Sequence, residues 1–398
     1  MLRSLIVSML CLFLAANTTA ADPAASTATA GTPKRAIIMV IDGLAVDALQ
    51  KAPTPNLNKL AAEGSVIKNV HVLVPDHTTL GEFGRMHAAT IPNISLMMGT
   101  FLISADSKFV QEQFYDARKW ATVNGVNEYS YQSIDRSFNI SLQNYLINDG
   151  ELLEWAVRTM KENPVRFMRL HLQDLGSSGW RCSRPGNEPW NQNIYGEGSP
   201  YVKQLGVVDE AVGKFVENVK AAGQWDDTLM IITADHGQSV KGGHPAIALD
   251  SCVTTAIVVG PGVKKGFSVA TADQVDLVPT LCSIMGVEPP NPGEGCGLVL
   301  NEIKVGQPDT PSRAKSWIDT FNRQHRDYIQ VTAQASLLAL EDPQSWWSLV
   351  WDLREQFYSI PRLATWNELK TVDNFLAHNQ KVLDGAWERL KNPNAPRR

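Results

Sequence analysis

Two apolar segments that each end in an aspartate constrain the fold of this chain more than any other feature. Residues 36–41 (AIIMVI) lead directly into Asp42, and residues 229–232 (LMII) lead into the TADHG segment that contains Asp235 and His236. Short apolar runs that end in turn residues are typical of buried strands, and open α/β sheets collect their reactive groups at such strand ends. The alternative is that Asp235 and His236 only cap a helix or form a turn. Because two distant strands each deliver an acid, we favour a shared site whose oxygen and nitrogen donors suit a divalent metal ion.

Length, charge and the first residues bound the kind of protein. The chain has 398 residues, of which 44% are hydrophobic, so it can bury a large core. Residues 1–20 have the form of a secretory signal peptide, and residues 21–34 are typical of a flexible leader. No run reaches the roughly 20 apolar residues that a membrane span needs, and a net charge of −5 without a basic stripe argues against a nucleic-acid-binding surface. We therefore expect an exported protein, periplasmic or extracellular, whose oligomeric state the sequence leaves open.

Four cysteines follow the signal segment, at positions 182, 252, 282 and 296. In an exported protein they permit two disulfides in three connectivities, and none has the CxxC spacing of a metal site. A short loop separates Cys282 from Cys296, which makes this pair the first choice for a disulfide. For Cys252 a buried free thiol is the alternative.

Strand and helix patterns alternate from residue 35 to about residue 300. An alternation of this kind builds a mainly parallel central sheet with helices on both faces. From residue 306 onward strand patterns stop, and a helical region begins whose tryptophans we expect to pack against the preceding domain. We predict an α/β domain over residues 35–305 and a helical C-terminal extension over residues 306–398. Strands are expected at 36–41, 65–72, 166–172, 229–232 and 254–259, and helices at 55–63, 149–161, 200–222 and 276–285.

The order of several motifs resembles that of the alkaline phosphatase superfamily, above all its type I phosphodiesterase/nucleotide pyrophosphatase branch. Each motif is weak alone, but together they cover about 270 residues in the family's order. The resemblance implies an alkaline-phosphatase-like catalytic domain over residues 35–305. The motifs are IIMVIDG at 37–43, PTPNLNKLAAEG at 53–64, TIPNISLMMG at 90–99, TADHG at 233–237 with GGH at 242–244, and VDLVPTL at 275–281.

The resemblance also implies a nucleophile. In this superfamily a hydroxyl-bearing residue at the start of a helix attacks phosphorus or sulfur, and Thr90 holds the matching position. A threonine hydroxyl needs a base or a metal to become nucleophilic, and a metal held by Asp42, Asp235 and His236 would serve Thr90 in this way. Asn93 matches a residue that donates to a non-bridging oxygen of the substrate, beside backbone N–H groups that favour anions. The alternative is that Thr90 is only a helix N-cap.

A second metal position is less complete. His244 resembles a ligand of that ion, but the family pattern D-x-x-G-H after the middle strand places Gly176 and Trp180 where its Asp and His should be. Asp174 is our choice as a replacement ligand, ahead of His171, which lies further inside the strand. We therefore expect one or two divalent ions, Zn²⁺ first, with Mn²⁺, Mg²⁺ or Ca²⁺ as alternatives.

The segment before Thr90 is longer and richer in ionisable groups than the family pattern. Its acids and histidines could supply further ligands, although a solvated loop is the simpler interpretation. These residues are Asp76, His77, Glu82 and His87.

Three function classes follow from these residues. The first is a metal-dependent phosphodiesterase or phosphatase that acts on small phosphate esters through a phosphothreonine. The second is a one-metal sulfatase-like or phosphonate ester hydrolase, although the segment 90–94 lacks the arginine of the usual sulfatase motif. The third is a pseudoenzyme that keeps the fold as a binding module, which the loss of ligands at 176 and 180 would explain. The retained Asp42, Asp235 and His236 favour an enzyme.

Overall fold

The computed structural model describes residues 31–73, 83–89, 108–116, 118–127, 137–292, 297–358 and 372–392. Within them a nine-stranded sheet has the order β4-β3-β5-β1-β6-β7-β2-β8, with β9 paired to β2. The five strands from β4 to β6 are mutually parallel, whereas β7 runs antiparallel to both β6 and β2. The strands are β1 (Arg35–Ile41), β2 (Ser65–His71), β3 (Ala121–Val126), β4 (Ile140–Gln143), β5 (Val165–Leu172), β6 (Thr228–Thr233), β7 (Val253–Val259), β8 (Phe267–Val269) and β9 (Ala272–Asp273).

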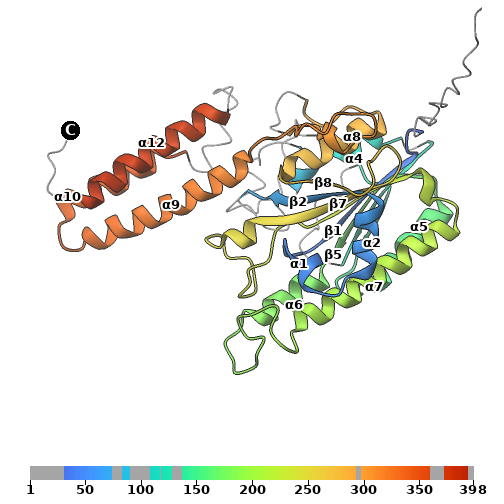
Figure 1. Cartoon of the computed structure of the whole chain (residues 1–398), viewed down its shortest axis with the longest axis horizontal. Coiled ribbons are helices and arrows are strands. Elements are labelled where there is room, and N and C mark those ends of the chain that lie inside the picture. The colour runs from blue at the N-terminus through green and yellow to red at the C-terminus, as the bar shows by residue number, and fades with distance from the viewer. Residues whose placement is uncertain are drawn as a thin grey trace, which may run out of the picture. The chain divides into compact units, whose positions relative to one another are not determined.

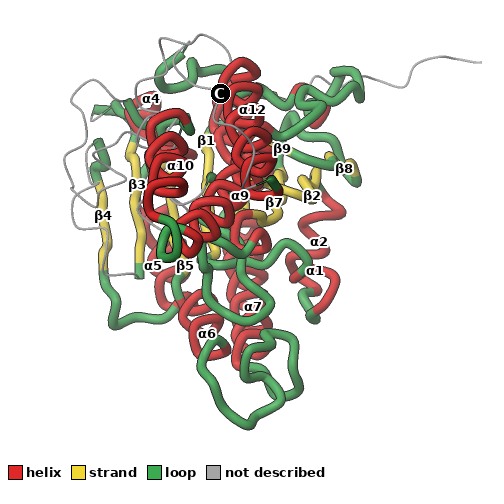
Figure 2. Tube along the Cα trace, turned by 90° about the vertical axis from the view of Figure 1, so that its left-hand side faces the viewer, coloured by secondary structure: helices red, strands yellow, loops and turns green. Residues whose placement is uncertain are grey.

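Helices cover both faces of this sheet (Figures 1 and 2). Alternate residues of β1 point to opposite faces, so Ile37 and Met39 join one core cluster while Ile38 and Val40 join the other. The first cluster is covered by α2 (Pro55–Glu63), α5 (Asp149–Glu162), α6 (Asp174–Cys182) and α7 (Pro200–Ala221), and the second by α4 (Val110–Phe114) and α8 (Leu277–Met285). A short helix, α1 (Ala48–Lys51), follows β1.

The predicted fold class is confirmed. The sheet is mainly parallel and lies between helices, because strands that are apolar on both faces must be covered on both. The predicted strands and helices are all present with ends that differ by a few residues. Further described elements of the α/β part were not predicted from the sequence, namely β3, β4, β8, β9, α1, α4 and α6.

The C-terminal region is helical, as predicted, and contains α9 (Trp317–Leu338), α10 (Pro343–Gln356) and α12 (Val372–Lys391). The start of α9 packs on the α/β part, where Trp317 and Phe321 join Leu73 and Val275 in one apolar cluster. The tryptophans of α10 were expected at that contact, and this expectation is wrong. Trp346 is buried among α9, α10 and α12 themselves, whereas Trp347 and Trp351 are exposed.

Cys182, Cys252 and Cys282 are buried free thiols. Burial raises the pKa of both Cys252 and Cys282 to about 12, so these thiols stay protonated and unreactive at neutral pH. Cys296, the suggested partner of Cys282, lies outside the described residues, as does the predicted signal segment.

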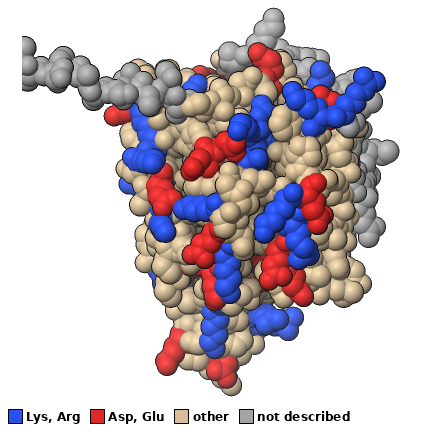
Figure 3. Space-filling model, turned by 90° about the vertical axis from the view of Figure 1, so that its right-hand side faces the viewer, with Lys and Arg blue, Asp and Glu red and all other residues tan. Residues whose placement is uncertain are grey.

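On the face of the molecule in Figure 3, basic and acidic side chains alternate over the surface. Among the described residues, Lys214 pairs with Glu210 and Lys51 pairs with Asp47, each one helical turn apart. Among the described helices, none combines the length and the apolar character required to cross a bilayer.

Candidate metal centre

The two strand-end acids meet at one edge of the sheet. Strands β1 and β6 are parallel neighbours, and Val40 pairs with Thr233, so Asp42 and Asp235 follow at equivalent positions. Asp42, Asp235 and His236 are at most 4% exposed. Asp42 and His236 are separated by 194 positions in the sequence, yet the topology places the three side chains side by side, as the sequence predicts.

These three side chains form a possible metal site. One ligand atom from each lies within 4.8 Å of the others, and among the described residues this is the group of acids, histidines and cysteines that meets this criterion. The His236 Nε2 atom lies 3.4 Å from Asp235 Oδ2 and 3.8 Å from Asp42 Oδ1. Two carboxylates buried together are costly unless a cation lies between them. The donor set therefore fits a divalent ion, with Zn²⁺ among the candidates.

The tautomer of His236 suits this role. Its Nδ1 atom lies 2.7 Å from the carbonyl oxygen of Gly237, which can only accept a hydrogen bond. Nδ1 must therefore carry the proton, which leaves the lone pair of Nε2 directed toward Asp42 and Asp235. A backbone carbonyl on the other ring nitrogen is the usual support of a metal-ligating histidine.

Buried hydrogen bonds fix Asp235. Its Oδ1 atom accepts the backbone N–H groups of Gly43 (3.2 Å) and His236 (2.9 Å). Its carbonyl oxygen accepts the side chains of Gln274 (3.0 Å) and Arg85 (3.3 Å), and Arg85 donates in turn to Gln274 Oε1. Neither Arg85 nor Gln274 was singled out by the sequence. Arg85 lies only five positions before the segment 90–99 in the sequence. Its contact with Asp235 can be recognised only once the arrangement of the strands is known.

His244 contacts the centre without joining the group of three. Its ring lies against that of His236, with centroids 3.9 Å apart, and the ring of Trp180 makes a T-shaped contact with it at a centroid distance of 5.3 Å. Burial, followed by the neighbouring His236, lowers the pKa of His244 to about 4, so its imidazole is neutral at neutral pH. The structure thus places His244 beside His236, and its predicted role as a ligand of a second ion stays a prediction.

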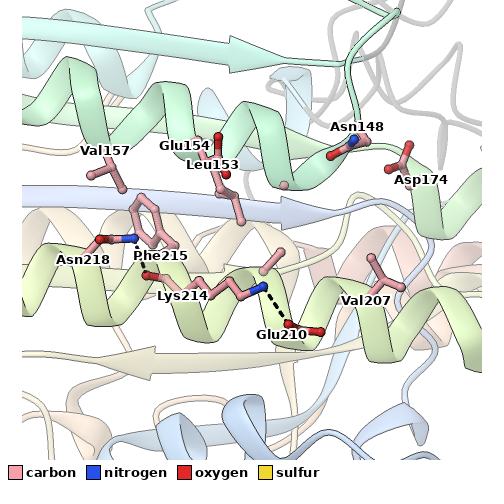
Figure 4. Close-up of a pocket in the computed structure, with 12 residues that line it drawn as sticks. Asn148, Leu153, Glu154, Val157, Asp174, Val207, Glu210, Lys214, Phe215 and Asn218 are labelled. Atoms are coloured by element: carbon pink, nitrogen blue, oxygen red, sulfur yellow. Dashed lines mark hydrogen bonds and ion pairs between the residues drawn. The ribbon is translucent and has the colours of Figure 1, made fainter.

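Asp174 is not where the prediction placed it. Its Oδ2 atom accepts the backbone N–H of Asp149 at the start of α5 (3.0 Å), and its own N–H donates to Asp149 Oδ1 (3.3 Å). Figure 4 shows it beside Asn148, at the edge of a cavity of about 260 Å³ between α5 and α7. The reason is helical geometry: Gly176 follows two residues later, about 200° around α6, and therefore faces the opposite side. Gly176, and not Asp174, faces Asp42.

His171, the weaker choice on sequence grounds, lies closer to the centre. It is fully buried near the end of β5, beside Val40 of β1, and its Nε2 atom lies 3.6 Å from Asp42 Oδ2. A histidine at this position can position the Asp42 carboxylate or contribute to the coordination of an ion.

Arg169 precedes His171 on the same face of β5 and was missed by the sequence analysis. Its guanidinium donates to His87 Nε2 and Asn124 Oδ1, each at 3.3 Å, and lies 3.4 Å from His171 Nδ1. The available signal was the pair Arg169 and His171, two residues apart in an otherwise apolar strand. Two such polar side chains on one face of a buried strand indicate a buried polar site. His87 was considered as a ligand but belongs to this arginine network. The other three candidates of that segment, Asp76, His77 and Glu82, lie outside the described residues.

Thr90 and Asn93 also lie outside the described residues. The described segment that precedes Thr90 covers residues 83–89 and ends at Ala89, which is buried and has a positive φ of 53°. Five positions before Thr90, Arg85 contacts the carbonyl of Asp235. The segment that leads to Thr90 is therefore anchored beside the centre.

Comparisons with known proteins agree with the resemblance that the order of the sequence motifs indicates. The sulfatase family model matches residues 167–287. The bis(5'-adenosyl)-triphosphatase enpp4 of Xenopus laevis is 25% identical over 258 residues, which cover 58% of this chain and 51% of that protein. The chain thus spans about half the length of this curated relative.

Solved structures share the fold. The 2-O GAG sulfatase BT1596 superimposes with a TM-score of 0.56 at 15% identity, over 71% of this chain and 76% of that one. The phosphonate monoester hydrolase SpPMH from Silicibacter pomeroyi gives a TM-score of 0.52 at 16% identity, over 71% and 78%. In its sequence relatives and in its fold, the chain resembles the alkaline phosphatase superfamily, as the order of its motifs predicts.

Proposed function

We propose that this protein is a metal-dependent hydrolase of phosphate esters, with diesters preferred, that acts through Thr90 and a phosphothreonine. The observation that carries the proposal is the convergence of Asp42, Asp235 and His236, buried on adjacent strand ends beside the segment that leads to Thr90. The relatives support the coarser conclusion of an ester hydrolase, since their names describe a triphosphatase, a phosphonate hydrolase and a sulfatase.

The proposed reaction has two in-line steps. In the first, Thr90 Oγ forms a bond to phosphorus, the ester oxygen leaves as an alcohol, and the configuration at phosphorus inverts. In the second, water attacks the phosphothreonine, inverts phosphorus again and restores Thr90. Asn93 donates a hydrogen bond to a non-bridging oxygen, a type of contact whose loss typically costs about 100-fold in rate. A divalent ion bound by Asp42, Asp235 and His236 would lower the pKa of the Thr90 hydroxyl and neutralise charge on the phosphoryl oxygens.

The test compares substrates and variants. Protein supplied with Zn²⁺ or Mn²⁺ is assayed with bis-p-nitrophenyl phosphate, p-nitrophenyl phosphate and p-nitrophenyl sulfate. We expect the diester to be hydrolysed fastest, and we expect Thr90→Ala to abolish turnover while keeping the fold and at least part of the metal. Thr310→Ala, at an exposed position after the α/β domain, is the matched control and should retain full activity. Undiminished turnover in Thr90→Ala would contradict a covalent mechanism.

A one-metal sulfatase-like or phosphonate ester hydrolase is the second candidate. Gly176 beside Asp42 favours it, because this residue offers no second-metal ligand. Faster hydrolysis of the sulfate than of either phosphate would move the protein to that class. A purified protein that binds no metal and hydrolyses none of the three would be a pseudoenzyme.

We also keep the exported location as part of the proposal. It rests on the form of residues 1–20. Fractionation of cells that express the full chain, with N-terminal sequencing of the product, tests it. A product that retains its first twenty residues in the cytoplasm would contradict it.

A further inference from the structure

Helix α6 contacts the metal centre through bare backbone. A Cβ atom placed on Gly176 would lie 1.9 Å from Asp42 Oδ1 and 2.5 Å from Asp42 Cγ. These distances are far shorter than any van der Waals contact, so the Asp42 carboxylate occupies the volume that a side chain at position 176 would need. Gly176 is therefore required by the observed orientation of Asp42.

A second side chain fills the neighbouring volume. The carboxamide of Gln238 lies between the turn after β1 and α6, because a Cβ atom on either Gly43 or Gly179 would lie 2.6 Å from it. Gln238 is 3% exposed, and its Nε2 atom donates to the carbonyl of Gly243 at 3.0 Å. One buried amide thus links α6, the turn that carries Asp42 and the loop that carries His244.

Position 180, where the related D-x-x-G-H pattern has a histidine, is occupied by Trp180. The ring of Trp180 makes a T-shaped contact with the ring of His244, and a Cβ atom placed on Gly243 would lie 3.3 Å from it. No donor atom for a metal is added there, since the indole N–H cannot coordinate. Near His244, positions 176 and 180 therefore present a bare backbone and an aromatic ring.

We propose that Gly176 and Gln238 are positioning residues that direct the Asp42 carboxylate toward Asp235 and His236, and that this packing makes the centre a one-ion site. The proposal rests on the metal-dependent function proposed above. It has an unexpected consequence: an aspartate at position 176, which would restore the ligand of the related D-x-x-G-H pattern, should displace Asp42 and weaken the existing site. A second site should not form.

Metal content tests the proposal without any assay of activity. Wild-type protein is stripped with a chelator, dialysed against Zn²⁺ and measured by mass spectrometry, and the affinity is obtained from a Co²⁺ titration followed by visible absorption. We expect one ion per chain in the wild type. Gly176→Ala and Gly176→Asp should each weaken the affinity by about tenfold or more, as losses of support around a metal ligand do.

Gly206→Ala is the matched control, because Gly206 lies in α7 with nothing within 4 Å of an added Cβ atom. It should keep the metal affinity of the wild type and be folded with equal or slightly higher thermal stability, since alanine favours a helix more than glycine does. Circular dichroism reports whether each variant is folded. If the Gly176 variants do not fold, Gln238→Ala replaces them: it adds no atom, opens the space between Gly43 and Gly179, and should weaken the affinity by a similar factor.

The outcomes separate the two proposals. Two ions in the wild type, or a second ion gained by Gly176→Asp, would overturn the one-ion inference, and unchanged affinity in both Gly176→Ala and Gln238→Ala would overturn the positioning role. Each of these results would leave the proposed hydrolase function intact. No ion in the wild type would overturn both.

Discussion

At the scale of single residues, Asp149 and Asp174 show how burial changes an acid. Each begins a helix, and each carboxylate accepts the backbone N–H of the other residue, so the two helix starts cap one another. Asp149 also accepts from Asn127 at 2.8 Å. Burial, followed by the charge of Asp174, raises the pKa of Asp149 from 3.8 to about 7. The folded protein therefore holds a proton here that the unfolded chain releases near pH 4.

This shift predicts a pH-dependent stability. An acid with a raised pKa in the folded state contributes stability that is complete below about pH 4 and is lost as the pH rises through about 7. Asp149→Asn is neutral at every pH, so its urea unfolding free energy should change less between pH 4 and 7 and should exceed the wild-type value at pH 8. The measurements are made in EDTA, so that metal binding adds no pH dependence of its own. Asp226→Asn, at an exposed acid, should reproduce the wild-type profile. A wild-type slope in Asp149→Asn would contradict the assignment.

How far the site could be predicted depends on the residue. Asp42, Asp235 and His236 were predictable because each follows an apolar strand, and parallel strands bring such positions to one edge. Asp174 was misplaced because its direction depends on where α6 begins, and the sequence of that segment gives no clear helix signal. Gln238 was not predictable, since its role exists only where two glycines from distant segments leave space for it.

At the scale of elements, one helix caps another. The N-cap residue of α2, Thr54, makes no side-chain cap. Asp209 of α7 takes this role: its carboxylate accepts the backbone N–H groups of Asn56 (3.1 Å) and Leu57 (2.8 Å). A buried negative charge at a helix N-terminus is favoured by the unpaired N–H groups and the helix dipole. This contact joins the segment after β1 to the longest helix on that face.

Asp209→Ala should therefore lower the free energy of unfolding by about 1–3 kcal/mol, because two backbone donors lose their acceptor in a buried place. Urea denaturation gives this value. Asp209→Asn keeps one acceptor oxygen and should lose less. Glu210→Ala, at the adjacent exposed position, should change stability by less than about 0.5 kcal/mol. Equal losses at 209 and 210 would show that the cap contributes nothing.

Two of the elements that were not predicted, α6 and β3, contain residues that are selected by packing at the site and not by local propensity. Helix α6 reads DLGSSGWRC, and its glycines and serines are poor helix formers. These glycines are present because Gly176 and Gly179 allow the helix backbone to approach Asp42 and Gln238. Strand β3 contains Asn124 and Gly125 for a similar reason, since Asn124 serves the buried Arg169. Residues that are selected for their contacts at the site have low helix or strand propensity. The secondary structure of such segments therefore cannot be predicted from propensity alone.

At the scale of the whole molecule, a buried charge cluster connects the C-terminal helices to the segment behind the centre. Arg313 is 8% exposed, and its guanidinium donates twice to Asp276, each time at 2.6 Å, and lies 3.1 Å from Asp273. Asp273 also accepts the hydroxyl of Ser316, the N-cap residue of α9. Between these two acids lies Gln274, which holds the carbonyl of Asp235. The beginning of α9 is thus tied to the same turn that supports a metal ligand.

Arg313→Met tests this connection. It leaves two buried carboxylates without their arginine, a loss that typically costs about 3–5 kcal/mol. Burial already raises the pKa of Asp273 to about 7. An acid of this kind can take up a proton as the pH falls, so we expect the loss measured by urea unfolding to be larger at pH 8 than at pH 5. Arg323→Met removes an exposed pair with Asp319 on α9 and should cost at most about 1 kcal/mol at either pH.

A triple variant separates the charge of Arg313 from its packing. If the ion pairs of Arg313 stabilise the contact between the two regions, adding Asp273→Asn and Asp276→Asn to Arg313→Met should recover part of the stability at pH 8, because no buried charge then remains uncompensated. A triple variant no more stable than Arg313→Met would mean that the arginine contributes through packing and not through its charge.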